Sequence, residues 1–94
     1  MPLIFEWNPR KARFNRRKHG VTFEEACTVF GDTFSVTIAD EQHSSASEER
    51  WITMGRSSRG NLLVIAHTES DTSIRLISAR AATRAEKRQY EENE

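Results

Sequence analysis

The sequence predicts a single α+β domain over residues 1–94, in which a small antiparallel sheet carries two N-terminal helices and a C-terminal helix. Apolar, β-branched runs at 62–66 and 74–77 are separated by the polar cluster 69–72, a pattern typical of a β-hairpin. Helix-start signals lie before and after this strand-rich region. A chain of 94 residues with 36% hydrophobic content can form one modest core.

The N-terminal residues predict a short strand followed by a helix. Residues 3–7 are rich in strand formers. Asn8 as N-cap and Pro9 at the first helical position start a helix, and Gly20 ends it after His19.

A second helix is expected from the capping box of Thr22 and Glu25 to about Phe30. Its core-facing stripe consists of Phe23, Ala26, Cys27 and Phe30. Cys27 is the only cysteine and is expected to be a buried small hydrophobe. No internal disulfide can form, which is typical of a reducing cytoplasm.

The remaining elements are four strands and a helix. Residues 34–38 alternate as in a half-buried strand, and 40–49 form a polar, acidic loop. A strand over 50–57 precedes the hairpin, so that successive strands make an antiparallel meander. A second capping box, Thr83 with Glu86, begins a final helix that reaches about residue 92.

The strand register decides where the ionisable groups lie. Four-residue hairpin loops would pair Arg56 with Asn61 and Thr68 with Ser73, and would place His67 on the same sheet face as the apolar Ile52 and Met54. A slip of one residue would move His67 beside Arg75 instead. The sequence leaves both registers open.

Charge is balanced overall but segregated along the chain. The 14 basic and 14 acidic residues give a net charge of zero. Two basic blocks stand out: Arg10, Lys11, Arg13, Arg16, Arg17 and Lys18, and then Arg75, Arg80, Arg84, Lys87 and Arg88. Such blocks favour a polyanion or an acidic partner, although a solvated helix face explains the first block equally well.

Several classes of site have no support in the sequence. The histidines and Cys27 lack the spacing of a metal site, no glycine-rich phosphate loop occurs, and the G-x-S-x-G motif of hydrolases is missing. We therefore expect neither metal nor cofactor. No run is long enough for a membrane span and no signal-peptide pattern is present, so we expect a cytoplasmic protein without membrane contact.

The remaining ionisable groups suit metal-free cleavage of RNA. Attack of a 2′-OH on the adjacent phosphate needs a base, an acid and cations for the developing charge. A strand-borne histidine such as His67 titrates near neutrality, and arginines clamp phosphates. The alternative is that His67 is a structural residue at a strand end.

Three segments carry a family resemblance: FEWNPRKARFNRRKHGVTFEEACTVFGD, ITMGRSSRGNLLVIAHTE and IRLISARAATRAEKRQYEE. The chain resembles the BrnT family of bacterial toxins over nearly its whole length. The resemblance implies a RelE-like ribonuclease fold and RNA cleavage that halts translation and growth. It also implies a partner: a BrnA antitoxin, a ribbon-helix-helix protein that binds DNA, neutralises the toxin and represses the operon with it.

The resemblance also marks candidate site residues at matching motifs. Lys18 and His19 lie in KHG, Arg56 in GRS and His67 in AHTE. The predicted catalytic set is His67, Arg56, Arg80, Arg75 and Tyr90, and the predicted RNA-binding set is Lys18, His19 and Arg59. The competing hypothesis is a non-catalytic module that docks a ribbon-helix-helix partner and modulates repression. Retention of the histidine and the arginines favours the ribonuclease.

Overall fold

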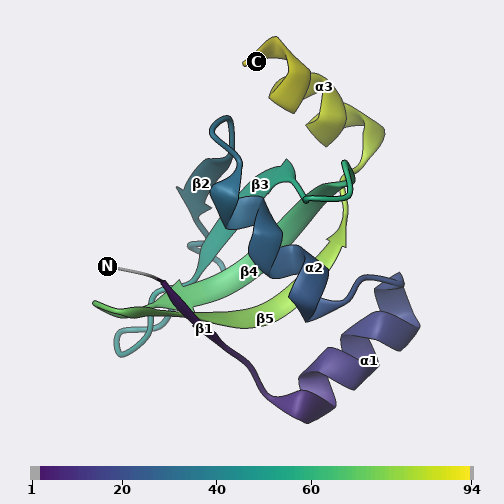
Figure 1. Cartoon of the computed structure of the whole chain (residues 1–94). Coiled ribbons are helices and arrows are strands. Elements are labelled where there is room, and N and C mark those ends of the chain that lie inside the picture. The colour runs from purple at the N-terminus through teal and green to yellow at the C-terminus, as the bar shows by residue number, and fades with distance from the viewer. Residues whose placement is uncertain (1–2, 94) are drawn as a thin grey trace.

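The computed structural model describes residues 3–93 and has an α+β architecture (Figure 1). In chain order the elements are β1 (Ile4–Glu6), α1 (Pro9–His19), α2 (Phe23–Cys27), the 3-10 turn η1 (Thr28–Gly31), β2 (Val36–Ala39), β3 (Trp51–Arg56), β4 (Leu62–Glu69), β5 (Ser73–Ala81) and α3 (Arg84–Glu92). No helix in this described part is long and apolar enough to cross a membrane.

The predicted boundaries of the first and last helices are confirmed, because short-range signals define them. The side chain of Asn8 accepts hydrogen bonds from the first turn of α1, and Gly20 ends the helix in the left-handed region at φ 71°. Thr83 and Glu86 form the predicted capping box of α3. The second helix differs from its prediction, since α2 ends at Cys27 and continues as the tighter turn η1.

The sheet has the order β1-β5-β4-β3-β2 and is mixed, which corrects the expected antiparallel sheet. Strands β2 to β5 form the predicted antiparallel meander. Strand β1 instead pairs in parallel with β5, with Phe5 opposite Ile74. The two helices between β1 and β2 carry the chain from one edge of the sheet to the other, and the connection from β1 to β5 is long enough for parallel pairing.

The predicted register was wrong in both hairpins. Arg56 pairs with Leu62 instead of Asn61, and Thr68 pairs with Arg75. A shift of one residue between β3 and β4 moves every β3 side chain to the other sheet face relative to the side chains of β4. The physical reason is a five-residue turn at 57–61, closed by Ser57 N–H donating to Asn61 O at 2.8 Å. A bulge between Ala66 and His67 then shifts the register with β5.

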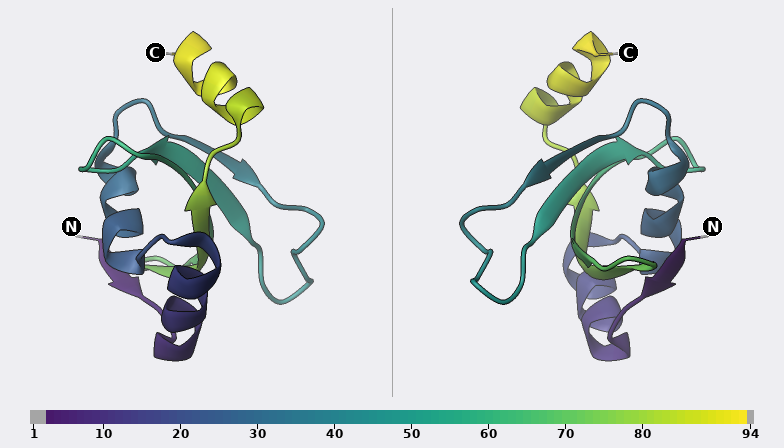
Figure 2. Two further views of the ribbon diagram at one scale, coloured as in Figure 1. Left: turned by 90° about the vertical axis from the view of Figure 1, so that its right-hand side faces the viewer. Right: turned by 90° about the vertical axis from the view of Figure 1, so that its left-hand side faces the viewer.

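The core lies between the sheet and the segment formed by α2 and η1. Figure 2 shows α2 over one face of the sheet and α1 beside the β5 edge. The buried apolar cluster consists of Val21, Phe23, Ala26, Val29, Leu63, Ile65, Ile74, Leu76 and Ala79. Val29 belongs to this core, whereas the predicted stripe residues Cys27 and Phe30 are only half-buried. Burial raises the pKa of the Cys27 thiol to about 11, so the thiol stays protonated and behaves as an apolar group.

Helix α1 is attached to the sheet by one buried polar residue. The Asn15 side chain donates to Val21 O at 3.0 Å and to Ala79 O at 2.8 Å, and it accepts from Ala79 N–H at 2.9 Å. Asn15 is 4% exposed, so these bonds are shielded from water. A side-chain amide thus satisfies the backbone of β5 as a neighbouring strand would.

We expect Asn15→Ala to lower the free energy of unfolding by about 2–3 kcal/mol, because it leaves buried backbone groups of Ala79 and Val21 without partners. Urea unfolding followed by circular dichroism measures this change. The neighbouring Arg16→Ala is the control, since Arg16 is exposed and both variants keep the helix propensity of alanine. Equal stability of the two variants would contradict the anchoring role of Asn15.

The second face of the sheet is open beside α3. A groove of about 400 Å³ lies there between apolar side chains of the sheet and polar side chains of α3. Its lining residues are Val36, Ile38, Ile52, Met54, Val64, Glu86, Gln89, Glu92 and Asn93. Strand β2 is exposed throughout, with Ile38 at 58%, because it is an edge strand whose outer face is uncovered. The strand predicted over residues 34–38 therefore forms, but no other element packs on it to make it half-buried as expected.

Candidate functional site

One hollow gathers basic and acidic side chains at the end of the sheet, under the turn between β3 and β4. This turn hollow has a volume of about 460 Å³. Its lining residues are His19, Gly20, Val21, Glu25, Arg56, Gly60, Asn61, Leu62, Leu63, Ala81, Ala82 and Lys87. The end of α1, the start of α2, the turn and α3 thus all contribute side chains to one concave surface.

Glu25 holds the turn above the hollow. Its Oε2 accepts from Ser57 Oγ at 2.6 Å and from Asn61 Nδ2 at 2.8 Å. The hydroxyl oxygen of Ser57 also accepts from the backbone N–H groups of Arg59 and Asn61. The bonds from Ser57 and then Asn61 outweigh burial and keep the Glu25 pKa below its usual value, so the carboxylate is ionised at neutral pH.

Arg56 enters the hollow from the end of β3 and is held on several sides. Its backbone N–H donates to Asp32 Oδ2 at 2.8 Å, and its Nη1 donates to Gly60 O at 3.3 Å. The guanidinium carbon lies 5.3 Å from the centre of the Tyr90 ring. Tyr90 O–H donates to the same Asp32 oxygen at 2.6 Å. Burial raises the Asp32 pKa, but the bonds from Arg56 N–H and Tyr90 outweigh it, so the pKa is lowered.

A second concavity continues from the first along α1. This helix groove has a volume of about 390 Å³ and lies between α1 and β5; it is lined by Arg10, Lys11, Phe14, Asn15, Lys18, His19, Ile77 and Ser78. His19 lines both the helix groove and the turn hollow. The predicted RNA-binding residues Lys18 and His19 therefore lie along one continuous surface with Arg56.

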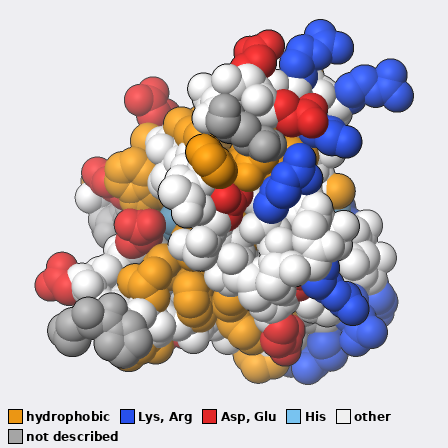
Figure 3. Space-filling model, turned by 45° about the horizontal axis from the view of Figure 1, so that its top comes forward, with side chains coloured by type: hydrophobic (Ala, Val, Ile, Leu, Met, Phe, Trp, Pro, Cys, Tyr) orange, Lys and Arg blue, Asp and Glu red, His pale blue; other side chains and the backbone are white. Residues whose placement is uncertain are grey.

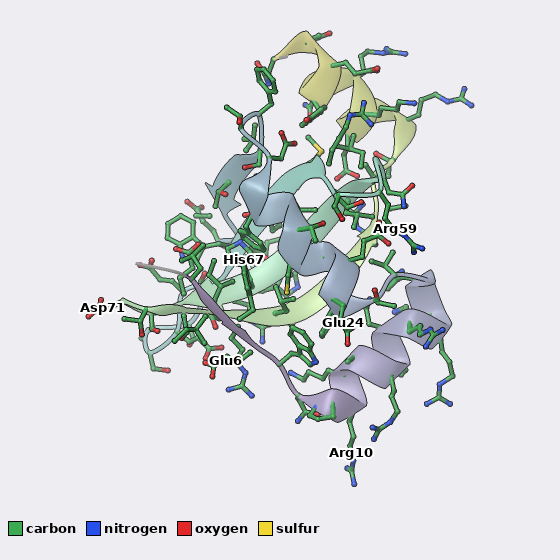
Figure 4. The ribbon with its side chains drawn as sticks, viewed as in Figure 1. Glu6, Arg10, Glu24, Arg59, His67 and Asp71 are labelled. Atoms are coloured by element: carbon green, nitrogen blue, oxygen red, sulfur yellow. The ribbon has the colours of Figure 1, made fainter. Side chains whose placement is uncertain are left out.

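Charge separates across the molecule. Figure 3 shows Lys and Arg side chains along one side of the molecule, while apolar and many acidic side chains lie toward the other. In Figure 4 Arg59 lies on the turn and Arg10 at the start of α1, whereas Glu6 and Asp71 lie at the far end of the sheet. The turn hollow and the helix groove thus belong to the basic side.

Comparison with known proteins gives a family for this arrangement. Residues 7–86 match the model of the family described as "Ribonuclease toxin, BrnT, of type II toxin-antitoxin system". The chain belongs to the BrnT family of ribonuclease toxins. A type II system implies an antitoxin partner.

A solved structure supports the BrnT fold. The chain is similar to the 1.1 Å crystal structure of the Brucella abortus ribonuclease toxin BrnT, with a TM-score of 0.66 and 16% sequence identity. The match covers 88% of this chain and 100% of that one. At this identity the likeness shows the fold alone. No curated protein matches the chain.

His67 is buried in this BrnT chain and does not line the turn hollow. The side chain is 0% exposed, and its ring packs edge-on against Phe30 with centroids 5.0 Å apart. Thr53 Oγ1 and His67 Nε2 share a hydrogen bond of 2.7 Å. Nδ1 has no hydrogen-bond partner among the residues that the structure describes and lies 3.6 Å from Glu69 Oε1. Burial lowers the His67 pKa to about 4, so the ring is neutral at physiological pH. The alternation of β4 places His67 on the same face as the buried Leu63 and Ile65, and the Phe30 ring of η1 packs against it there.

Two predicted arginines also lie outside the turn hollow. Arg80 donates from both terminal nitrogens to Glu86, at 2.7 and 2.9 Å, and so ties β5 to α3. The bonds from Arg80 lower the Glu86 pKa to about 2. Arg75 lines a separate depression at the opposite end of the sheet, where Glu6 and Glu69 are also found. Of the predicted site residues, Arg56 and His19 line the turn hollow, Tyr90 packs against Arg56 from below the surface, and Arg59 lies on the turn itself. Arg75, Arg80 and His67 do not line the hollow.

Sequence reasoning missed two residues of the turn hollow, Glu25 and Lys87. Glu25 was assigned only to the helix cap, where its backbone N–H does bond to Thr22 Oγ1 at 3.1 Å. Lys87 was one of several cations in the second basic block. Within residues 3–93, no group of three or more His, Cys, Asp or Glu side chains is placed to hold a metal ion.

Proposed function

We propose that the chain is an endoribonuclease that cleaves RNA in the turn hollow, by attack of a 2′-OH on the adjacent phosphate and without a metal ion. The observation that carries this proposal is the lining of one 460 Å³ hollow by His19, Arg56 and Lys87. A proton-transfer group, a planar phosphate-binding cation and a second cation thus share one concave surface. These are the groups that the reaction needs.

In the proposed reaction His19 takes the proton of the 2′-OH. The 2′-oxygen then attacks phosphorus, and the bond from phosphorus to the 5′-oxygen breaks. Arg56 binds the phosphate oxygens, on which negative charge develops, and Lys87 donates a proton to the leaving 5′-oxygen. The products are a 2′,3′-cyclic phosphate and a 5′-hydroxyl, so atoms and charges balance. Because the ring of His19 is exposed, a substrate reaches it directly.

The predicted site residues take different roles in this proposal. Arg59, on the turn, binds RNA at the rim of the hollow. Tyr90 and Arg80 hold α3, and with it Lys87, through their bonds to Asp32 and Glu86. The burial of His67 argues against the catalytic role predicted for it. Arg75 has no place in the proposed reaction.

The proposed partner is a BrnA-like ribbon-helix-helix antitoxin that neutralises the toxin in the cytoplasm and represses the operon with it. The family supplies the expectation of an antitoxin. The open apolar groove beside α3 offers this chain a protein-binding surface apart from the turn hollow, with the exposed Ile38 on its floor. Its wall carries Glu86 and Glu92, which disfavour RNA at that surface.

Incubation of the purified chain with total RNA in excess EDTA tests the proposal. We expect cleavage to persist in EDTA and to leave 2′,3′-cyclic phosphate ends, because the protein's own side chains move the protons. Adding the purified product of the neighbouring reading frame is expected to stop it. Cleavage that disappears in EDTA and returns with a divalent ion would contradict the metal-free mechanism. A folded chain that binds the neighbouring product but never cleaves RNA would favour the non-catalytic module.

A further inference from the structure

We propose that the helix groove is a binding site for single-stranded RNA, in which one base stacks on the ring of Phe14. This inference rests on the proposed ribonuclease function and adds a substrate class to it: unpaired RNA, bound beside the bond that is cleaved. Phe14 belongs to neither predicted set of site residues.

The first observation is the exposure of Phe14. This side chain is 60% exposed although it lies on α1, a helix attached to the sheet. The residue next to it, Asn15, makes the buried contacts that attach the helix. An aromatic ring left in water beside a polar anchor contributes little to folding. The exposed ring is therefore available for a planar ligand.

The second observation is the set of cations around the ring. Arg10, Lys11 and Lys18 line the same groove as Phe14, and Lys18 Nζ lies 5.8 Å from the centre of the ring. Among residues 3–93, no acidic side chain lines this groove. A basic groove that contains an exposed aromatic ring is the arrangement with which proteins bind single strands, since phosphates follow the cations while bases stack.

The third observation is continuity with the turn hollow. His19 lines both the helix groove and the turn hollow. A strand whose scissile phosphate lies at Arg56 and His19 therefore reaches Phe14 by following α1 toward its N-terminus. The stacked nucleotide and the reacting nucleotide then lie on one strand. The site thus contributes to positioning as well as to affinity.

Stacking on Phe14 selects against paired RNA. A base within a duplex is stacked on both faces and turned inward, so its plane cannot meet the ring. Unpaired loops and ends expose their bases and can be splayed onto an aromatic side chain. We therefore expect the chain to bind unpaired segments in preference to helices.

The test measures binding of an RNA that cannot be cleaved. A short single-stranded oligonucleotide with 2′-O-methyl groups lacks the nucleophile, and a 2-aminopurine base in it reports stacking through loss of fluorescence. We expect Phe14→Ala to weaken binding of this probe roughly 5- to 100-fold, the range of stacking contributions per base. The same variant is also expected to abolish the quenching of 2-aminopurine fluorescence. Phe14→Tyr is expected to retain both, whereas Phe14→Leu, which is apolar but has no ring, is expected to lose both.

Matched controls separate stacking from charge and from folding. Phe34→Ala removes another exposed ring, 49% accessible, that lines neither the groove nor the turn hollow, and we expect it to bind the probe like the wild type. The same oligonucleotide in a duplex is expected to bind wild type and Phe14→Ala equally. Circular dichroism checks that each variant is folded.

Three results would overturn the proposal. In the first, Phe14→Ala binds the single strand as tightly as the wild type. In the second, Phe14→Ala loses the same affinity for the single strand and for the duplex. In the third, Phe14→Ala still binds RNA but no longer binds the product of the neighbouring reading frame. The last result would make the groove a protein interface. A wild-type chain that quenches the probe but cleaves no natural RNA would instead refute the proposed function and leave the binding site standing.

Discussion

Arg56→Ala is expected to slow RNA cleavage about 100- to 1000-fold, the usual consequence of removing one preorganised group that stabilises charge in the transition state. The guanidinium is held by Gly60 O and by the Tyr90 ring, so its position is fixed before substrate binds. Single-turnover cleavage of a defined RNA measures the rate. Arg56→Lys keeps the charge but loses the planar fork, and we expect it to recover only part of the rate.

Arg75→Ala is the matched control for that experiment, because it removes the same side chain from an exposed position at the other end of the sheet. We expect this variant to cleave RNA like the wild type. Equal losses of cleavage rate in Arg75→Ala and Arg56→Ala would show that the rate depends on the net charge of the protein and not on the turn hollow. Full activity of folded Arg56→Ala would remove Arg56 from the mechanism.

Stability is expected to fall by about 3 kcal/mol as the pH is lowered from 6.5 toward 4, because His67 is buried as a neutral ring. Its pKa falls from an ordinary value of 6.5 to about 4 in the folded state, so below 6.5 the unfolded chain binds a proton that the folded chain does not. The contribution of His67 to the free energy of unfolding is therefore fully present above pH 6.5 and is lost as the pH approaches 4. The loss from the Arg80–Glu86 pair comes at lower pH, between 4.5 and about 2.

His67→Gln is the control, since glutamine keeps a polar end for Thr53 and does not titrate. Urea unfolding at a series of pH values measures both proteins. We expect the wild type to lose stability relative to His67→Gln between pH 6.5 and 4. Parallel curves would show that His67 has the same pKa in the folded and unfolded states and would contradict the burial of a neutral ring. The same variant tests the catalytic prediction, because a folded His67→Gln protein that cleaves RNA normally would exclude proton transfer by His67.

Helix ends could be predicted from sequence because their causes are local. The bonds from the Asn8 and Thr83 side chains reach backbone groups two or three residues away. The strand register has more distant causes. The turn at 57–61 has its length because Ser57 and Asn61 bond to Glu25, more than thirty residues earlier in the chain. No alternation pattern within the hairpin contains that information.

The candidate site could be predicted in part, for the same reason. Arg56, Arg59 and His19 could be selected from their motifs, and they do lie on one side of the molecule. Histidine suits the chemistry, so His67 could be predicted as a candidate. Its burial could not be predicted, because it depends on Phe30, which comes from a distant part of the chain and packs against the ring. No sequence motif marks Lys87 as a site residue, since only the packing of α3 brings its side chain to the turn hollow.

The parallel pairing of β1 with β5 has a consequence for how this chain is made. Strand β1 leaves the ribosome early, yet its partner residues begin at Ser73. Helix α1 likewise must wait for Ala79, to which Asn15 bonds. Contacts so distant along the chain form late in synthesis and slow the folding of a small domain. A nascent chain that stops before residue 73 therefore has neither the β1–β5 pair nor the residues of β5 and α3 that line the turn hollow.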